Sequence, residues 1–253
     1  MEPSLEELAE HTEVHLLPRA TFEKVERAGF VYLAGLRSAN LHPYRVDDVR
    51  AAVDWSRAES RRRGHRDIEW WVGWRTAPGD LADALLELGL VRSADPPTLA
   101  GMTSTSEPPR APGIEVRRVE TVEDYTDALE VDWEVWRVSA EERVSRRELE
   151  IGRFEEMHAT ETVHHFAAFL DGQQVGFGRA IDMPTAVALF GGAVLEDARG
   201  NGVYRALVHT RWEHAVARGT PVLAVQAGPM SAPVLDRLGF RRHGDVQLFM
   251  DRL

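Results

Sequence analysis

The segment best suited to chemistry, by residue type and spacing, is Arg199-Gly200-Asn201-Gly202. It lies between an apolar run, Val187 to Leu195, and a stretch whose apolar residues have helical spacing, Val203 to Arg218. A strand, a glycine-containing turn and the start of a helix bring several backbone N–H groups and the positive end of the helix dipole to one point. The sequence therefore predicts a binding site for an anion.

Other arrangements of this loop fit the sequence less well. Asn-Gly is a common hairpin turn, but Tyr204, Leu207 and Trp212 recur at helical rather than alternating spacing. A dinucleotide-binding fingerprint would need a third glycine at the position of Arg205. The chain contains no Walker loop, His-Glu-x-x-His pair or Gly-x-Ser-x-Gly elbow. A plain β-turn is the structural alternative to the anion site.

The charge balance limits the class of partner. The 253 residues carry a formal net charge of -11, which disfavours binding to nucleic acid or to an anionic membrane surface. A basic cluster, Arg57 to Arg66, falls at the predicted C-terminal end of a helix, where it complements the dipole. We expect neither nucleic acid nor a membrane as a partner.

The chain offers few metal ligands or strong nucleophiles. It contains no cysteine, which excludes disulfides, thiolate nucleophiles and cysteine-based metal sites. His209 and His214 are five residues apart and would not share a helix face, and His164 and His165 would point to opposite sides of a strand. We therefore expect no metal.

Targeting signals are not evident in the sequence. The first residues, Met1 to Glu7, lack the basic and apolar regions of a secretory signal. The longest apolar run, Ala186 to Leu195, is too short to span a bilayer. These features predict a cytoplasmic protein.

A change in composition divides the chain. Residues 103–113 carry three prolines and no apolar periodicity, which is typical of an interdomain linker. The sequence therefore predicts two α/β domains, residues 1–107 and residues 108–253.

The second domain is predicted to be mixed α/β with a largely antiparallel front half. Asp171-Gly172 indicates a hairpin turn, and Gly191-Gly192 inside an apolar strand suits a bulge or a close backbone approach. Apolar periodicity predicts strands at 114–119, 164–170, 174–181, 187–195, 222–226 and 246–253, and helices at 121–138, 140–158, 203–218 and 231–238.

The first 105 residues repeat the end of this pattern. Helices are predicted at 47–62 and 78–88, and strands at 68–74 and 99–103. Arg63-Gly64 and Arg218-Gly219 occupy matching positions before a strand. We interpret this as a degenerate internal repeat, with chance similarity of two α/β units as the alternative. Because Leu41 to Val46 contains no glycine, we expect the first copy to lack an anion loop.

The loop, together with Ser231 to Phe240 about thirty residues later, resembles the GNAT superfamily of acyl-CoA-dependent N-acetyltransferases. That family's cofactor motif is Arg or Gln, two variable residues, Gly, one variable residue, then Gly or Ala. Arg199 and Gly202 fit the first and fourth places, and Tyr204 stands in the sixth, where a small residue is usual. The resemblance is strong over 114–253 and weak over 1–105. It implies tandem GNAT-like folds, each a mixed, mostly antiparallel α/β sheet with splayed central strands flanked by helices.

The resemblance implies acetyl-CoA as the acyl donor. In the family the pyrophosphate binds at the loop, and the pantetheine arm pairs with a strand that splays from its neighbour. If the Tyr204 ring points away from this site, the site survives the substitution. The cofactor residues implied are Ala193, Val194, Leu195, Arg199, Gly200, Asn201, Gly202, Val203 and Tyr204.

The resemblance also implies a base for the acceptor amine and an acid for the departing thiolate. Many members place a Tyr acid in the last helix, where this chain has Leu235. Glu196, directly after the cofactor strand, is the first candidate base, and Tyr204 is the candidate acid. Asp132 and Glu134 are second candidate bases, because in the family their segment covers the acceptor. A solvated surface role is the alternative for each acid.

Residues for the acceptor are less clearly marked. Trp133 and Trp136 are three apart on one helix face and are candidates for the wall of an amine pocket, with core packing as the alternative. Gln226 is a candidate for orienting the substrate, or a capping residue. The hypothesis is an N-acetyltransferase that transfers acetyl directly to an amine of a small molecule or peptide. Because the usual acid is missing, a non-catalytic acyl-CoA-binding or regulatory protein is the alternative.

Overall fold

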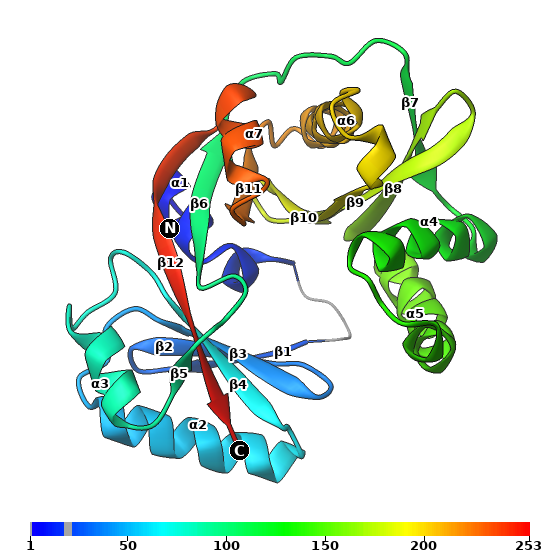
Figure 1. Ribbon diagram of the computed structural model, residues 1–253. Coiled ribbons are helices and arrows are strands. Elements are labelled where there is room, and N and C mark those ends of the chain that lie inside the picture. The colour runs from blue at the N-terminus through cyan, green and yellow to red at the C-terminus, as the bar shows by residue number, and fades with distance from the viewer. Residues whose placement is uncertain (1, 18–21) are drawn as a thin grey trace. The chain divides into compact units, whose positions relative to one another are not determined.

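The computed structural model describes residues 2–17 and 22–253, which form two compact units. The first unit consists of Met1–Thr103 together with Val225–Leu253, and the second of Ser104–Ala224. Each unit contains strands of a sheet and helices that pack on it (Figure 1). Within the described residues, no helix combines the length and the apolar composition needed to cross a bilayer.

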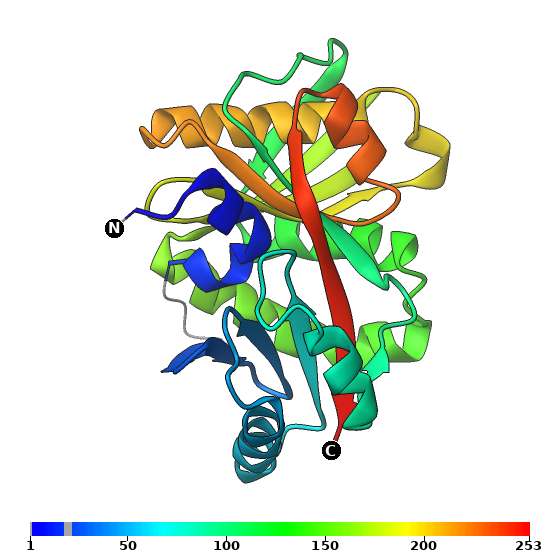
Figure 2. The same ribbon diagram turned by 90° about the vertical axis from the view of Figure 1, so that its left-hand side faces the viewer.

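The first unit takes strands from both ends of the chain. Its strand order is β1-β2-β3-β4-β12-β6, and β12 pairs antiparallel with β4, β5 and β6. Figure 2 shows β12 in red, running to the C-terminus. The elements are α1 (Leu5–Glu10), the 3-10 helix η1 (Thr12–His15), β1 (Glu23–Arg27), β2 (Phe30–Ala34), β3 (Ser38–Pro43), α2 (Val49–Arg63), β4 (Asp67–Val72), α3 (Leu81–Glu87), β5 (Val91–Arg92), β6 (Thr98–Ser104), α7 (Ala232–Arg237) and β12 (Arg241–Arg252).

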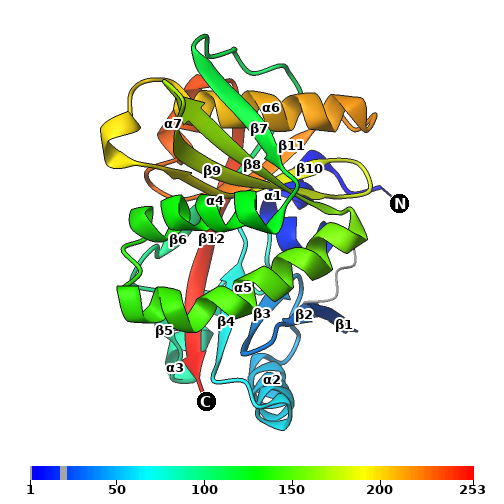
Figure 3. The same cartoon turned by 90° about the vertical axis from the view of Figure 1, so that its right-hand side faces the viewer.

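The second unit has the strand order β11-β10-β9-β8-β7. Helix α6 covers one face of this sheet, and α4 and α5 lie on the other face (Figure 3). Its elements are β7 (Ile114–Val119), α4 (Val122–Val135), α5 (Ala140–Thr160), β8 (Val163–Leu170), β9 (Gln173–Asp182), β10 (Val187–Val194), the 3-10 turn η2 (Glu196–Ala198), α6 (Val203–Ala217) and β11 (Leu223–Ala227), which crosses the division between the units.

Local sequence explains the hairpin between β8 and β9. Asp171 and Gly172 have φ angles of 50° and 80°. A two-residue type I′ turn needs positive φ at both positions, which Asp and Gly tolerate well. The pairing then runs antiparallel from Leu170 and Gln173 to Val163 and Ile181. The predicted hairpin is confirmed.

The two units share a strand–helix–strand pattern. Strand β3 pairs parallel with β4 after the crossover through α2, and β10 pairs parallel with β11 after the crossover through α6. Both helices are followed by a glycine with a φ of 75°, Gly64 and Gly219. This agreement in topology supports the internal repeat.

The structure differs from the sequence-based prediction mainly at the ends of the chain. Helix α1 and strands β1 to β3 were not anticipated, because short segments without strong periodicity carry little signal. Strand β12 starts at Arg241 instead of Val246, since its charged first part is held by backbone pairing with β6. The first compact unit also contains Val225–Leu253, and the division into domains 1–107 and 108–253 stays a prediction.

Candidate functional site

The backbone of β10 leaves regular pairing at its glycine pair. The register with β9 shifts between Phe190 and Gly192, and Gly191 has a φ of 48°, a conformation that favours glycine. Both glycines are exposed. The predicted bulge is confirmed, and it leaves main-chain atoms accessible in the middle of the strand.

Strand β10 also has an open edge. Its parallel pairing with β11 is confined to Val187 and Ala188, whereas its antiparallel pairing with β9 continues to Val194. In the part of the chain that the structure describes, no second strand pairs with β10 after Ala188. A strand edge of this kind can pair with the amides of an extended ligand. Ala193 and Val194 end this strand, with Ala193 buried in the core, and Leu195 follows as the N-cap of η2.

The loop after β10 leads into a helix whose N-terminus accepts no side-chain cap from the described residues. Gly200 and Gly202 have φ angles of 84° and 87°, and Gly202 is the N-cap of α6, followed by the buried Val203. The amide of Asn201 donates to the carbonyl of Ala198 at 3.3 Å, which stabilises the turn.

The matching helix of the first unit is capped differently. The carboxylate of Asp48 accepts from the backbone N–H of Ala51 at 2.9 Å, at the start of α2. An anionic cap is thus built into α2, whereas Gly202 brings no side chain to the positive end of the α6 dipole. The two helices thus begin differently, and an anion site at the start of α6 stays a prediction.

Two guanidinium groups add positive charge at the start of α6. Arg199 is exposed, and its Nε donates to the carbonyl of Val194 at 3.3 Å. Nη2 of Arg205 would lie 3.0 Å from a Cβ added to Gly202, and the buried Nε of Arg205 has no hydrogen-bond partner among the described residues. An unpaired buried N–H is costly, so Arg205 favours an anion at this point. The sequence alone does not single out Arg205, because any surface helix can carry an arginine there.

The Tyr204 side chain does not point away from the open strand. A Cβ added to Gly192 would lie 2.5 Å from Cε2 of Tyr204, so the ring rests on the bulge. The condition that the ring points away from this strand is therefore not met, and binding of a cofactor beside Tyr204 stays a prediction. Glycine at position 192 is what makes room for the ring. The candidate acid and the proposed cofactor strand are in contact.

A buried arginine lies behind the bulge, on the α6 side of the sheet. Arg211 is 1% exposed, and its guanidinium packs on Gly178, which pairs with Gly192. Its Nη1 donates to the carbonyl of Arg179 at 3.1 Å, while its Nη2 has no partner among the described residues. Burial lowers the pKa of Arg211 to about 10, which still leaves it charged at neutral pH.

Candidate bases Glu196 and Glu134 line one open cavity of about 470 Å³. Glu196 is exposed on η2, and Asp171 and Asp197 are further acidic members of the lining. The structure thus brings together two of the acids that the sequence suggested. Asp132, the remaining candidate, is buried on α4 and contacts Arg179 and Trp136.

The two tryptophans of this segment lie in different environments. Trp133 is 4% exposed and belongs to the hydrophobic core, whereas Trp136 is 65% exposed. Trp136 is the C-cap of α4, one residue past the end of the regular helix. Core packing, the alternative role for the pair, describes Trp133, and a role of Trp136 in an acceptor pocket stays a prediction.

Gln226 and its hydrogen-bond partner both belong to the first unit. Its Nε2 donates to the carbonyl of Glu10 at 2.7 Å, which ties β11 to the end of α1. The contact gives this polar residue a structural role, and its role in orienting the substrate stays a prediction.

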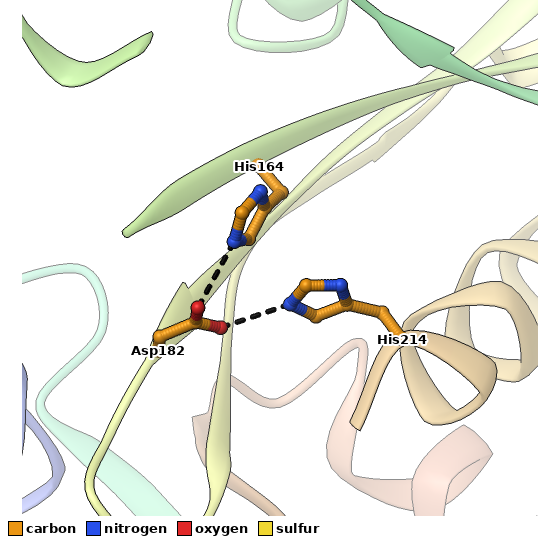
Figure 4. A group of neighbouring side chains, drawn as sticks. All are labelled: His164, Asp182 and His214. Carbon is orange, nitrogen blue, oxygen red and sulfur yellow. Dashed lines mark hydrogen bonds and ion pairs between the residues drawn. The ribbon is translucent and has the colours of Figure 1, made fainter. Parts of the chain in front are cut away.

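A second polar cluster lies at the far end of β8 and β9 from the hairpin. Nε2 of His164 and Nε2 of His214 lie 3.0 Å and 2.9 Å from the two carboxylate oxygens of Asp182 (Figure 4). The three side chains come within the distances of a metal-ligand group. Nε of Arg218 also contacts Asp182, at 2.9 Å.

The partners of this cluster favour hydrogen bonding over metal ligation. Nη2 of Arg118 lies 2.8 Å from Nδ1 of His164. Arginine can only donate, so Nδ1 accepts and Nε2 of His164 carries the proton that bonds Asp182. A protonated Nε2 cannot ligate a metal, and Arg218 already neutralises the carboxylate. The absence of a metal nevertheless stays a prediction.

The same cluster predicts acid sensitivity. Burial by itself would raise the pKa of Asp182, but hydrogen bonds from His164 and His214 outweigh burial and lower the pKa to about 2. Because this value lies below the ordinary 3.8, ionised Asp182 stabilises the fold above about pH 4, and the contribution is lost as the pH falls towards 2. It amounts to about 2 kcal/mol, of which about 1 kcal/mol is lost by pH 3.

Urea unfolding at pH 6 and pH 3 checks this contribution. The free energy of unfolding of Asp182→Asn should lie below that of the unsubstituted protein at pH 6, and the gap should narrow at pH 3. Equal gaps at the two pH values would contradict the prediction.

Comparison with known proteins agrees with this geometry. The model of the acetyltransferase (GNAT) family matches residues 122–240. A GCN5-related N-acetyltransferase from Kribbella flavida superposes with a TM-score of 0.70 at 16% identity, over 99% of this chain and 96% of that one. A tandem GNAT protein from the clavulanic acid biosynthesis pathway gives 0.61 at 15% identity, over 99% and 88%. FemX gives 0.56 at 11% identity, over 100% and 97%.

These structural similarities concern the fold, because all three identities are low. No curated protein matches the sequence. The predicted tandem GNAT-like architecture is confirmed by the tandem GNAT neighbour and by the mixed, mostly antiparallel sheet. Residues 122–240 are therefore a domain of the GNAT acetyltransferase family, in a chain with the fold of the tandem GNAT proteins.

Proposed function

We propose that the second unit binds acetyl-CoA and transfers its acetyl group to an amine of a small molecule or peptide. One observation carries this proposal: the open edge of β10 leads directly into the uncapped N-terminus of α6, which Arg199 and Arg205 flank. Coenzyme A has a matching order of groups, an amide-containing arm followed by a pyrophosphate. Gly200, Asn201, Gly202 and the first residues of α6 are the proposed seat of the pyrophosphate.

The strand edge is needed as well as the loop. A helix N-terminus contributes about 0.3–1 kcal/mol per charge when exposed and up to about 2 when partly buried. A micromolar ligand requires roughly 8 kcal/mol. The backbone of Ala193, Val194 and Leu195 is the proposed partner of the ligand amides, and it would supply part of the difference.

The chain's own groups can support acyl transfer beside the bulge. When bound, acetyl-CoA supplies an acyl group activated as a thioester. A C–N bond forms and the C–S bond breaks; one proton leaves the nitrogen and one reaches the sulfur. We assign the first proton to Glu196, or to Asp132 as the second candidate base, and the second proton to Tyr204, whose ring lies on Gly192. Exposed main chain at Gly191 and Gly192 is the proposed donor to the carbonyl oxygen.

Binding and turnover can be separated by experiment. Acetyl-CoA and coenzyme A should raise the melting temperature, and a panel of amines should release free thiol from acetyl-CoA. If neither compound raises the melting temperature, the proposal fails.

Glu196→Gln should lower the rate of thiol release while leaving the affinity for acetyl-CoA unchanged, because the substitution removes a proton acceptor outside the pyrophosphate seat. Asp197→Asn is the matched control, since it removes the same charge one residue away on the same exposed turn. The base assignment is contradicted if the two variants behave alike in steady-state kinetics.

A second candidate function is a non-catalytic acyl-CoA-binding or regulatory protein. It is favoured by Leu235, which stands where many family members have a catalytic Tyr and is fully buried here. Stabilisation by acetyl-CoA without thiol release from any amine would support this second function.

A further inference from the structure

On the α4 side of the sheet, Arg179 lies over the bulge of β10. A Cβ added to Gly191 would be 3.7–3.8 Å from Nε, Cζ and Nη2 of Arg179. The side chain is 31% exposed, so a ligand can reach it. Gly191 is exposed as well. A guanidinium group therefore borders the main chain at which the proposed acyl transfer takes place.

Arg179 is incompletely paired. Its buried Nε has no hydrogen-bond partner among the residues that the structure describes. Its ion pair with Asp132 is long, with 3.4 Å between Nη2 and Oδ2. By contrast, Arg57 and Asp251 of the first unit form a bidentate pair at 2.8 Å and 2.9 Å. Charge-assisted hydrogen bonds are normally about 2.7–2.9 Å long, so Arg179 retains capacity for another carboxylate.

Asp132 supplies the opposite charge beside this guanidinium. Its Oδ1 accepts from Nε1 of Trp136 at 3.2 Å, which fixes the indole next to the pair. Burial raises the pKa of Asp132, but Arg179 opposes this shift. Asp132 and Arg179 thus hold a carboxylate and a guanidinium side by side, next to the Trp136 indole, which is 65% exposed.

We propose that the acceptor is an amine that also carries a carboxylate, as in an α-amino acid, with its carboxylate on Arg179 and its amine near Asp132. This assignment rests on the proposed function, because the bulge is the site of transfer there. An acceptor with only positive charge would be opposed by Arg179. An amine with a carboxylate two bonds away satisfies both groups and exchanges one long ion pair for two shorter contacts. The exposed face of Trp136 would contact an apolar part of the acceptor.

The requirement for a carboxylate on the acceptor can be tested with three amines that share a phenethyl skeleton: L-phenylalanine, L-phenylalanine amide and phenethylamine. With acetyl-CoA present, the KM of L-phenylalanine should be about 10- to 100-fold lower than that of the other two, the range expected for one charge-assisted contact. Calorimetric binding without acetyl-CoA should show the same order. Equal KM values and equal affinities for the three compounds would overturn the assignment.

Variants of Arg179 test whether this guanidinium causes the preference for a carboxylate. Arg179→Gln should abolish the preference for L-phenylalanine, and Arg179→Lys should restore part of it by keeping the charge. Arg117→Gln is the control, because Arg117 is an exposed arginine of the same sheet and does not border the bulge. Asp132→Asn should weaken the binding of L-phenylalanine and of phenethylamine to the same extent, because both compounds carry the amine. A preference that survives Arg179→Gln would contradict the proposal.

Binding of acetyl-CoA, measured by thermal shift on the same variants, distinguishes two kinds of failure. If acetyl-CoA does not bind the unsubstituted protein, the proposed function itself is wrong. If acetyl-CoA binds and amines are acetylated without regard to a carboxylate, only the acceptor class is overturned.

Discussion

Gly202→Glu should reduce the affinity for coenzyme A by at least about 100-fold and leave the protein folded. An added side chain would meet Nη2 of Arg205 at 3.0 Å and Cβ of Ala111 at 3.2 Å. Its carboxylate would sit at the start of α6, where the dipole and the guanidinium of Arg205 attract an anion. The substitution thus fills the proposed pyrophosphate seat with a competing charge and repels the ligand. Isothermal titration calorimetry measures the loss directly.

The control for this variant is Gly219→Glu at the opposite end of the same helix. Gly202 and Gly219 have φ angles of 87° and 75°, so both substitutions carry a similar backbone cost of about 1–2 kcal/mol. Gly219 is exposed and has no atom within 4 Å of an added Cβ. Its variant should bind coenzyme A normally. Equal affinities of the two variants would reject the loop as the pyrophosphate seat.

Trp133→Ala should lower the free energy of unfolding by about 3–5 kcal/mol, the usual cost of truncating a buried aromatic side chain. Trp133 is 4% exposed and packs in the core of the second unit with Tyr125, Phe154 and Phe177. The guanidinium of Arg147 lies 5.2 Å from its ring and would lose that contact as well. Urea denaturation gives the change.

Trp136→Ala provides the matched comparison three residues later. This indole is 65% exposed, so its removal should cost less than about 1 kcal/mol of stability. It should weaken acceptor binding, because the ring lies beside Asp132 and Arg179. A large loss of stability in Trp136→Ala, or a small one in Trp133→Ala, would show that the two environments have been assigned wrongly.

Much of the fold follows from local patterns. The turn at Asp171-Gly172 and the bulge at Gly191-Gly192 depend on backbone conformations that glycine makes accessible, so their residue types reveal them. Helix α6 follows from the apolar spacing after Gly202. By contrast, β12 pairs with β4 and β6, which precede it by well over a hundred residues. No local pattern records a pairing partner at that separation.

Some residues of the candidate site could likewise be predicted from the sequence, and others could not. Arg199, Gly200 and Gly202 could be identified because they are consecutive or nearly so, and the loop acts through its own backbone. Arg179 and Asp132 could not be connected in advance, since they lie 47 residues apart on a strand and a helix. The cluster of His164, Asp182 and His214 was missed for the same reason.

The sequence by itself determined the hairpin and the bulge, because each depends on backbone conformations set by neighbouring residues. It also predicted the anion loop and carried the resemblance to the GNAT family through consecutive residues. The tertiary structure decided which side chains meet. It placed the ring of Tyr204 on Gly192, buried Trp133 while exposing Trp136, and brought Arg179 over the bulge. Such contacts depend on how helices pack on the sheet, and packing joins residues that are distant in the chain.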